Sequence, residues 1–191
     1  MNICVYGASS SAINERYIQE VERLGEVMAE RGHGLVFGGG ASGCMGASAR
    51  GVRRRQGKVL GIAPTFFNVD GVLFEDCTDF IPTETMRQRK QHLEEKSDGF
   101  VIAPGGIGTY DEFFEILTLK QLGRHNKPIV IFNVDGYYDP MLAMLRDAME
   151  KSFVQESVGE LYAILTDAEE VVRYIEEYDD PQREVSFYKK V

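Results

Sequence analysis

Residues 100–122, FVIAPGGIGTYDEFFEILTLKQL, contain the pattern that decides the fold of this 191-residue chain. The opening run at residues 100–103 is short and uniformly apolar, as expected of a strand that is covered on both faces. A glycine-rich loop follows, and residues 110–122 then have the spacing of apolar side chains that is typical of a helix. A buried strand that leads through a loop into a helix is the repeating unit of a parallel sheet.

The same unit recurs on either side of this stretch. Further strands are predicted at residues 3–6, 35–37, 59–63, 80–81, 129–132 and 163–165. Further helices are predicted at residues 14–31, 46–56, 85–96, 138–152 and 168–178, with an irregular segment at 64–78. We therefore expect an α/β fold in one domain over residues 1–178, a single Rossmann-like doubly wound parallel sheet with helices on both faces, followed by a polar tail at 179–191.

Composition excludes several classes of function. The formal charge of −9 argues against a nucleic-acid partner, which would favour a basic surface, although it leaves room for a small anionic ligand. No apolar run reaches the roughly 18 residues that cross a membrane, so we expect no membrane partner. The three cysteines (Cys4, Cys44 and Cys77) are far apart and predict neither a disulfide framework nor a metal site. Reduced thiols favour a cytoplasmic protein.

The loops between strands and helices are the places to look for chemistry, because ligands of such sheets bind beyond the carboxyl ends of the strands. The first candidate is GGGASGCMG at residues 38–46, where five glycines precede a helix and can expose a row of backbone N–H groups to an anion. Its spacing also matches a dinucleotide fingerprint, but it follows the second strand and no acidic residue stands about 20 positions later. A phosphate of a mononucleotide is the favoured ligand, and a tight packing turn is the alternative.

The second candidate is PGGIGTYDE at residues 104–112, which provides another set of glycine N–H groups before a helix. Thr109 and Glu112 also have the spacing of a capping box, which competes with a functional role for both residues. Thr166 and Glu169 have the same spacing and are predicted to form only a cap. Capping alone does not require three glycines, so a ligand explains the loop at 104–112 better.

The third candidate is TETMRQRK at residues 83–90, in which Thr85 and Gln88 can cap a helix that carries Arg89 and Lys90 in its first turns. Taken alone, this basic pair is predicted to be a solvated surface pair. The run of three arginines at 53–55 is likewise predicted to be the basic end of a helix, and the pairs Phe113–Phe114 and Tyr137–Tyr138 are predicted to fill the core and interfaces.

Together and in this order, GGGASGCMG at 38–46, M-x-x-R-K at 86–90 and PGGIGTYDE at 104–112 resemble the signature of the LOG ("lonely guy") family of cytokinin-activating phosphoribohydrolases, many of which were formerly labelled lysine decarboxylases. The resemblance spans residues 2–178. It implies a nucleotide-binding catalytic domain that forms a homodimer and hydrolyses the N-glycosidic bond of an adenine-type nucleoside 5′-monophosphate, AMP or N6-prenylated AMP. The products are the free base and ribose 5-phosphate, and neither a metal nor an organic cofactor takes part.

The resemblance also assigns roles to residues. Arg89 and Glu112 are the predicted catalytic pair: the carboxylate stabilises an oxocarbenium-like state and activates water, with Glu115 one turn later as a second carboxylate. The guanidinium supplies a fixed cation and a forked donor. The residues predicted to bind the substrate and its phosphate are Ser9, Gly43, Met45, Gly46, Lys90, Gly105, Gly106, Ile107, Gly108, Thr109, Glu115 and Thr118.

Two other functions stay open at this point. Related folds with PGGxGT loops carry the molybdenum cofactor without catalysis, and a third group of Rossmann-type relatives handles DNA. The combination of Arg89, Lys90 and Glu112 favours catalysis over a carrier, since a carrier has no use for an oxocarbenium stabiliser. The acidic charge weighs against a DNA-handling protein.

Overall fold

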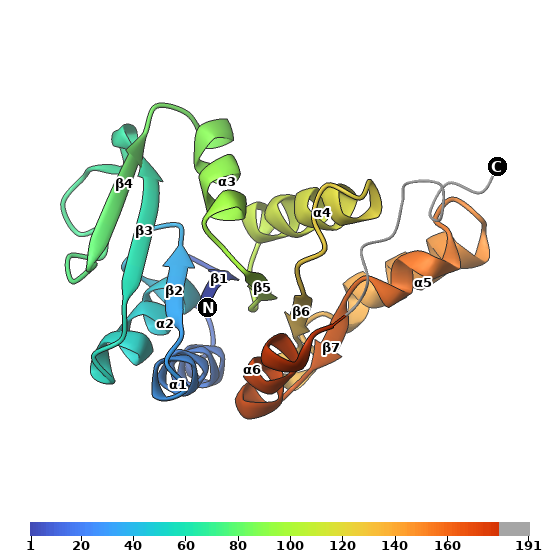
Figure 1. The fold of residues 1–191 in the computed structure, drawn as a ribbon, viewed down its shortest axis with the longest axis horizontal. Coiled ribbons are helices and arrows are strands. Elements are labelled where there is room, and N and C mark those ends of the chain that lie inside the picture. Colours follow the sequence, from blue (N-terminus) through green and yellow to red (C-terminus); the bar gives the residue numbers. More distant parts are fainter. Residues whose placement is uncertain (180–191) are drawn as a thin grey trace.

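The computed structural model describes residues 1–179, so all but the first residue of the predicted polar tail lies outside the described residues. Within that range seven strands form one parallel sheet in the order β4-β3-β2-β1-β5-β6-β7 (Figure 1). The strands are β1 (Asn2–Tyr6), β2 (Gly34–Phe37), β3 (Val59–Pro64), β4 (Asp79–Thr83), β5 (Gly99–Ile102), β6 (Ile129–Phe132) and β7 (Ala163–Leu165). The predicted doubly wound parallel sheet is confirmed.

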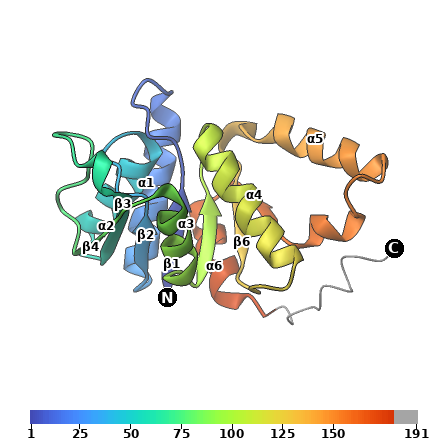
Figure 2. The same cartoon turned by 90° about the horizontal axis from the view of Figure 1, so that it is seen from above.

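Helices cover both faces of the sheet (Figure 1 and Figure 2). The edge strand β4 lies at one end of the molecule and α5 lies at the other. The helices are α1 (Glu15–Glu30), α2 (Gly43–Arg54), α3 (Met86–Glu95), α4 (Ile107–Gln121), α5 (Asp139–Glu150) and α6 (Ala168–Glu177). Because side chains alternate along a strand, Ile3 and Val5 pack with α1, α2 and α6, whereas Cys4 and Tyr6 face α3, α4 and α5. Each face of the sheet therefore has its own apolar core.

The topology fixes where a ligand can bind. The chain winds outward from β1 to β4, then returns to place β5 on the other side of β1 and winds outward again to β7. The loops that follow β1 and β5 thus lead away in opposite directions, which opens a crevice at their carboxyl ends. The two loops are joined at this point by a hydrogen bond of 2.9 Å from Ala8 N to Pro104 O.

Both glycine loops contribute to the helices that follow them. Helix α2 begins at Gly43 and α4 at Ile107, each three residues earlier than the sequence predicts. Glycine disfavours helix interiors, so a prediction from the sequence starts each helix only after the last glycine of the loop, which is too late. The first turn of a helix needs no partner within the helix for its N–H groups, and glycine is tolerated there.

Helix capping agrees with the sequence at one of three predicted boxes. Thr85 caps α3 by accepting from Gln88 N at 3.2 Å, as expected. The predicted Thr166 cap is wrong, because Asp167 occupies the N-cap position of α6 and accepts from Glu170 N at 3.0 Å. The Thr109 cap is wrong as well: Gly106 is the N-cap residue of α4, and no side chain caps this end.

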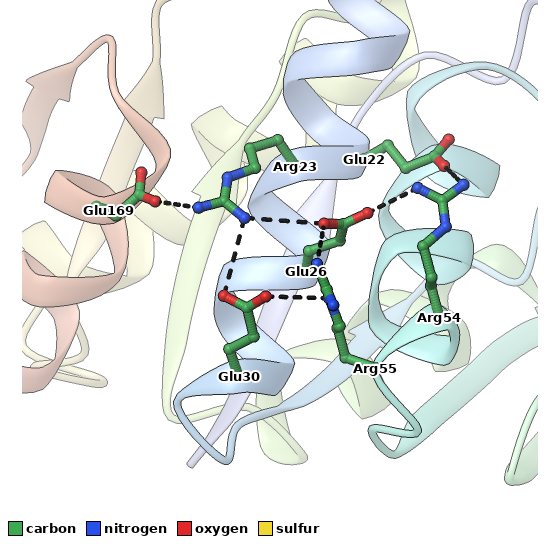
Figure 3. Close-up of polar contacts among 7 residues, drawn as sticks. All are labelled: Glu22, Arg23, Glu26, Glu30, Arg54, Arg55 and Glu169. Carbon is green, nitrogen blue, oxygen red and sulfur yellow. Dashed lines mark hydrogen bonds and ion pairs between the residues drawn. The ribbon is translucent and has the colours of Figure 1, made fainter.

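The arginines at the end of α2 join a network of ion pairs with α1 that also reaches α6 (Figure 3). Glu26, whose side chain is 12% exposed, accepts from Arg54 at 2.7 Å and from Arg55 at 3.0 Å, and Arg23 lies 3.8 Å away. Arg23 in turn pairs with Glu169 on α6. The arginine run is the basic end of a helix, as predicted, and its pairing with α1 was not apparent from the sequence. Among the described residues, no helix is long and apolar enough to cross a membrane.

We expect Glu26→Gln to lower the free energy of unfolding at pH 7 by about 1 kcal/mol, because this half-buried carboxylate pairs with several arginines. The hydrogen bond from Arg54 lowers the pKa of Glu26 below its ordinary value of 4.5. This contribution to stability is therefore present above pH 4.5 and is lost as the pH falls through the lowered pKa, so the difference between variant and wild type disappears there. Urea unfolding between pH 3 and pH 8 measures it.

The matched control is Asp147→Asn, which removes an exposed pair between the last turn of α5 and Lys151, the residue that follows it. An isolated surface pair of this kind contributes less than about 0.5 kcal/mol. Equal losses in the two variants would show that the network adds nothing beyond a single exposed pair.

Candidate active site

A cavity of about 560 Å³ lies at the carboxyl ends of the central strands, where the three loops singled out in the sequence meet. Its wall contains residues from the loop after β1, the glycine loop after β2, the segment between β3 and β4, the first turns of α3 and the start of α4. They are Gly7, Ala8, Ser9, Gly38, Gly40, Ala41, Ser42, Met45, Phe67, Gly71, Val72, Leu73, Met86, Arg89, Gly106, Ile107, Gly108, Thr109 and Glu112.

A buried ion pair forms the charged part of this wall. Arg89 Nη1 donates to Glu112 Oε1 at 2.8 Å, and the two side chains are only 7% and 9% exposed. Arg89 Nε also donates to the carbonyl of Ile62 at 3.3 Å, which fixes the plane of the guanidinium. Burial raises the pKa of Glu112 above its ordinary value, and the charge and hydrogen bond of Arg89 oppose that rise. A buried charge pair is a weak device for stability, so its place in a cavity wall indicates function.

The backbone of Gly38 makes room for this pair. A Cβ atom at Gly38 would lie 1.9 Å from Arg89 Nη2, so no larger residue fits without displacing the guanidinium. The first glycine of the loop thus serves the arginine directly. From the sequence alone, Gly38 was expected only to be one of several loop glycines.

The amino terminus of α4 faces the cavity without a side-chain cap. The first N–H of this turn that bonds to a carbonyl is that of Tyr110, which donates to Gly106 O at 3.0 Å. The N–H groups of residues 107–109 come before it in the first turn, where N–H groups have no acceptor within the helix. Together with the positive end of the helix dipole they form a site for an anion such as a phosphate.

The first glycine loop offers fewer donors than the sequence suggests. Met45 N donates to Ala8 O at 3.1 Å, and Gly46 N donates to Ser42 O at 3.0 Å. A Cβ at Gly46 would lie 1.9 Å from Ala41 O, so this glycine permits a close turn. Two of the predicted phosphate donors are thus already bonded within the protein, and the start of α4 is the better anion site.

Two tyrosines hold the loop after β5 in place. Tyr137 Oη donates to Gly105 O at 2.6 Å, and Tyr138 Oη donates to Ala103 O at 2.7 Å. Asn133 orients the second tyrosine by accepting from its N–H at 2.7 Å. Tyr138 fills the core as predicted, but the support that both hydroxyls give to the loop was not apparent from the sequence.

The predicted site residues fall into two groups. Those that line the cavity are Ser9, Met45, Arg89, Gly106, Ile107, Gly108, Thr109 and Glu112. Those that lie outside its wall are Gly43, Gly46, Lys90, Gly105, Glu115 and Thr118. In the second group Lys90 forms ion pairs with Asp111 and Glu115, whereas Thr118 is an exposed residue farther along α4.

The segment between β3 and β4 supplies a wall that the sequence did not predict. Phe67, Val72 and Leu73 line the cavity from this segment, joined by Met86 at the start of α3. The segment is attached to the glycine loop by hydrogen bonds from Ala41 N to Val72 O at 2.9 Å and from Phe74 N to Gly39 O at 2.8 Å. It has neither helical nor strand periodicity, so no pattern marked it. Its contact with a glycine-rich loop is visible only in three dimensions.

Within residues 1–179, no three side chains of His, Cys, Asp or Glu come together in a way that could hold a metal ion.

Comparison with known proteins identifies relatives that match nearly the whole chain. A family described as "Possible lysine decarboxylase" matches residues 45–175. The cytokinin riboside 5′-monophosphate phosphoribohydrolase LOG2 of Arabidopsis thaliana is 35% identical over 92% of this chain and 83% of its own length. A probable enzyme of the same name from Oryza sativa subsp. japonica, LOGL9, is 38% identical over 92% of this chain and 78% of its own.

Among solved structures, the molybdenum cofactor carrier protein of Chlamydomonas reinhardtii superposes with a TM-score of 0.70 over 92% of this chain and 96% of its own, at 19% identity. The DNA processing protein A of Streptococcus pneumoniae superposes with a TM-score of 0.59 over 94% of this chain and 62% of its own, at 13% identity. At these identities the likeness concerns the fold alone.

We expect Gly38→Ala to separate Arg89 from Glu112, because the added Cβ would lie 1.9 Å from the guanidinium. The free energy of unfolding should fall by about 1–3 kcal/mol, as in other overpacked sites. Gly108→Ala is the control, since a Cβ there meets nothing within 4 Å and stability should hardly change. A crystal structure of the Gly38 variant in which the 2.8 Å contact persists would contradict this account of the site.

Proposed function

This chain belongs to the family described as possible lysine decarboxylases, which includes the cytokinin riboside 5′-monophosphate phosphoribohydrolases, and from that premise we propose that it hydrolyses the N-glycosidic bond of an adenine-type nucleoside 5′-monophosphate. The products are the free base and ribose 5-phosphate. The observation that carries the proposal is the buried Arg89–Glu112 pair in the wall of a cavity that also contains the uncapped start of α4.

The phosphate is held at the amino terminus of α4. The N–H groups of residues 107–109 and the hydroxyl of Thr109 are the donors available there. Glu112 follows Thr109 by three residues, so its carboxylate lies one helical turn from the phosphate on the same side of the helix. A ribose can bridge this interval, and the energy of phosphate binding is converted into positioning of C1′ beside the carboxylate.

The carboxylate and the guanidinium share the chemical step. As the bond between C1′ and the base breaks, positive charge develops on the sugar, and Glu112 stabilises it. The same carboxylate accepts the proton of the attacking water. Arg89 lowers the pKa of Glu112 against the larger effect of burial, and its second arm can donate to the departing base or to the ribose.

The apolar part of the wall receives the base. Phe67, Val72, Leu73 and Met86 line the cavity and offer an apolar surface against which a purine can pack. The free thiols of Cys4, Cys44 and Cys77 fit a reducing compartment, which supports a cytoplasmic location. The formal charge of −9 supports a small nucleotide as the partner in place of a nucleic acid.

We expect the purified protein to release free base from AMP or N6-isopentenyl-AMP in the presence of EDTA, with much less release from adenosine, which lacks the phosphate. Chromatography of the reaction mixtures measures this. Tight binding of the nucleotide without turnover would instead indicate a carrier. Equal turnover of AMP and adenosine would contradict the phosphate site at α4.

Glu112→Gln is the decisive variant in the same assay. The amide retains an acceptor for Arg89 but neither carries charge nor accepts the proton of water, so kcat should fall by about 100-fold or more. The free energy of unfolding should fall by only about 1–3 kcal/mol, because one hydrogen bond to a charged group is weakened. Glu177→Gln, at an exposed position near the end of α6, is the control and should leave both quantities unchanged.

We also propose that the protein is a homodimer. Phe113 and Leu117 on α4 are buried in the core of the chain itself and give no support for an interface there. Met144 on α5 and Phe153 just beyond it are 55% and 85% exposed, which is the support the structure offers. Sedimentation should give twice the chain mass of 21.5 kDa at micromolar concentration, and Met144→Glu should shift it toward the monomer.

A further inference from the structure

A second cavity, of about 450 Å³, lies beside the edge strand β4 and has no part in the proposed hydrolysis. Its volume is within the range of sites that bind small molecules, roughly 300–1,000 Å³. Its wall is formed by the end of β3, by β4 and by the segment that connects these two strands (Figure 1). The lining residues that matter here are Leu73, Phe74, Glu75, Cys77, Asp79 and Phe80.

The apolar part of this wall packs directly on glycine backbone. Phe80 on β4 is paired in register with Gly61 on β3, and a Cβ at Gly61 would lie 2.7 Å from Phe80 Cδ2 and 3.0 Å from Cys77 Sγ. The bare backbone of β3 therefore lets both side chains lie against the sheet. Phe74 is held on the other side, since its N–H donates to Gly39 O at 2.8 Å. Two phenylalanines thus have fixed places in the wall of the second cavity.

The charged part of the wall is acidic. Glu75 and Asp79 both line the cavity, whereas Asp76 between them is paired with Arg53 at 2.9 Å. Within residues 1–179, neither Glu75 nor Asp79 forms an ion pair with a basic side chain. Both are exposed, so a ligand can reach them from solvent. Two carboxylates without a cationic partner attract a cation, and the faces of phenylalanine rings attract one as well.

We propose that this second cavity binds a small organic cation, whose apolar body packs against Phe74 and Phe80 and whose charged group contacts Glu75 and Asp79. The same carboxylates repel a phosphate, so the site is distinct from the one proposed for the nucleotide. Binding here does not depend on the proposed hydrolysis and goes beyond it.

Leu73 links this site to the first cavity, because it lines both. Gly38 and Gly40 line the first cavity, and Gly39 between them touches the second: a Cβ there would lie 3.5 Å from Leu73 Cδ2 and 3.3 Å from Phe80 Cε2. The first glycine loop and Leu73 therefore form the partition between the two cavities. A ligand that restricts Leu73 on one side leaves less motion to be lost when the other cavity is filled, so each ligand should strengthen the binding of the other.

The test uses three probes with the same ring and different charge at pH 7: benzylamine, benzyl alcohol and benzoate. Each is titrated into protein with ¹³C-labelled leucine methyl groups, and the signals of Leu73 are identified by their loss in Leu73→Ile. Benzylamine should shift the Leu73 signals and bind at least about fivefold more tightly than benzyl alcohol, which is roughly the effect of one charge at close range near water. Benzoate should bind most weakly.

Two sets of variants separate the charge from the ring. The double variant Glu75→Gln with Asp79→Asn should remove the preference for benzylamine over benzyl alcohol, and Phe80→Ala should weaken both probes. The matched controls are Asp70→Asn and Phe66→Ala, which change exposed residues of the same segment that do not line the second cavity. Both controls should bind the probes as wild type does. Thermal melts identify any variant that fails to fold, in which case the comparison of the three probes on wild type still decides.

Equal affinity of wild type for benzylamine and benzyl alcohol would overturn the proposal. So would an unchanged preference in the double variant, an equal loss in Asp70→Asn, or binding that leaves the Leu73 signals in place. Because these measurements need no turnover, a protein that releases no base from AMP would contradict the proposed function and leave this result standing.

The link through Leu73 is measured in Glu112→Gln, in which turnover of AMP is slow. Saturating AMP should lower the dissociation constant of benzylamine at least about twofold. An unchanged constant would show that Leu73 does not couple the two cavities.

Discussion

The buried contact between Arg89 and Glu112 is the interaction on which the candidate site depends. Removing two charges from water is costly, and their attraction compensates only when the geometry is close and the remaining hydrogen bonds are satisfied. The surrounding structure supplies both conditions through the carbonyl of Ile62 and the bare backbone of Gly38. A buried ion pair is a weak device for stability, so one held this closely in a cavity wall fits a protein that uses its charges for chemistry.

The glycines around the cavity act in different ways, although they look alike in the sequence. Gly38 leaves room for a guanidinium, whereas Gly46 allows a turn of the chain to close on Ala41. Gly106 and Gly108 have open space where a side chain would be, beside N–H groups at the start of a helix. The absence of a side chain at Gly105 lets Thr109 pack against the loop backbone, since a Cβ there would lie 2.1 Å from the Thr109 hydroxyl. Some of these glycines therefore allow close packing, whereas Gly106 and Gly108 leave space through which an anion can reach the N–H groups.

Contacts behind the site also support it. Tyr137 and Tyr138 fix the carbonyls of the loop after β5, and the hydrogen bond between Ala8 and Pro104 ties that loop to the one after β1. On the other face, the ion pairs of Glu26 bind α1 to α2, the helix that follows the first glycine loop (Figure 3). The segment that carries Phe67 and Leu73 is the exception, since a single isolated bridge, made of two backbone hydrogen bonds, attaches it to that loop. A wall held in this way can adjust to the shape of a base while the charged pair stays in place.

The parallel sheet, the order of strands and helices along the chain, and three of the segments that line the site could be predicted from local patterns in the sequence. Apolar runs such as residues 129–132 predict buried strands, because a strand that is covered on both faces has no exposed position for a polar residue. The tertiary structure decided what Thr109 and Glu112 do: their spacing fits a helix cap, but α4 starts at Ile107, and Glu112 binds an arginine 23 residues away. It also decided that Lys90 and Glu115 bind each other behind the cavity, and that residues 67–73 line it. Local sequence patterns indicate which side chains are buried and where helices can begin. The partner of a charged group depends on contacts between elements that are far apart in the sequence and meet only in the folded chain.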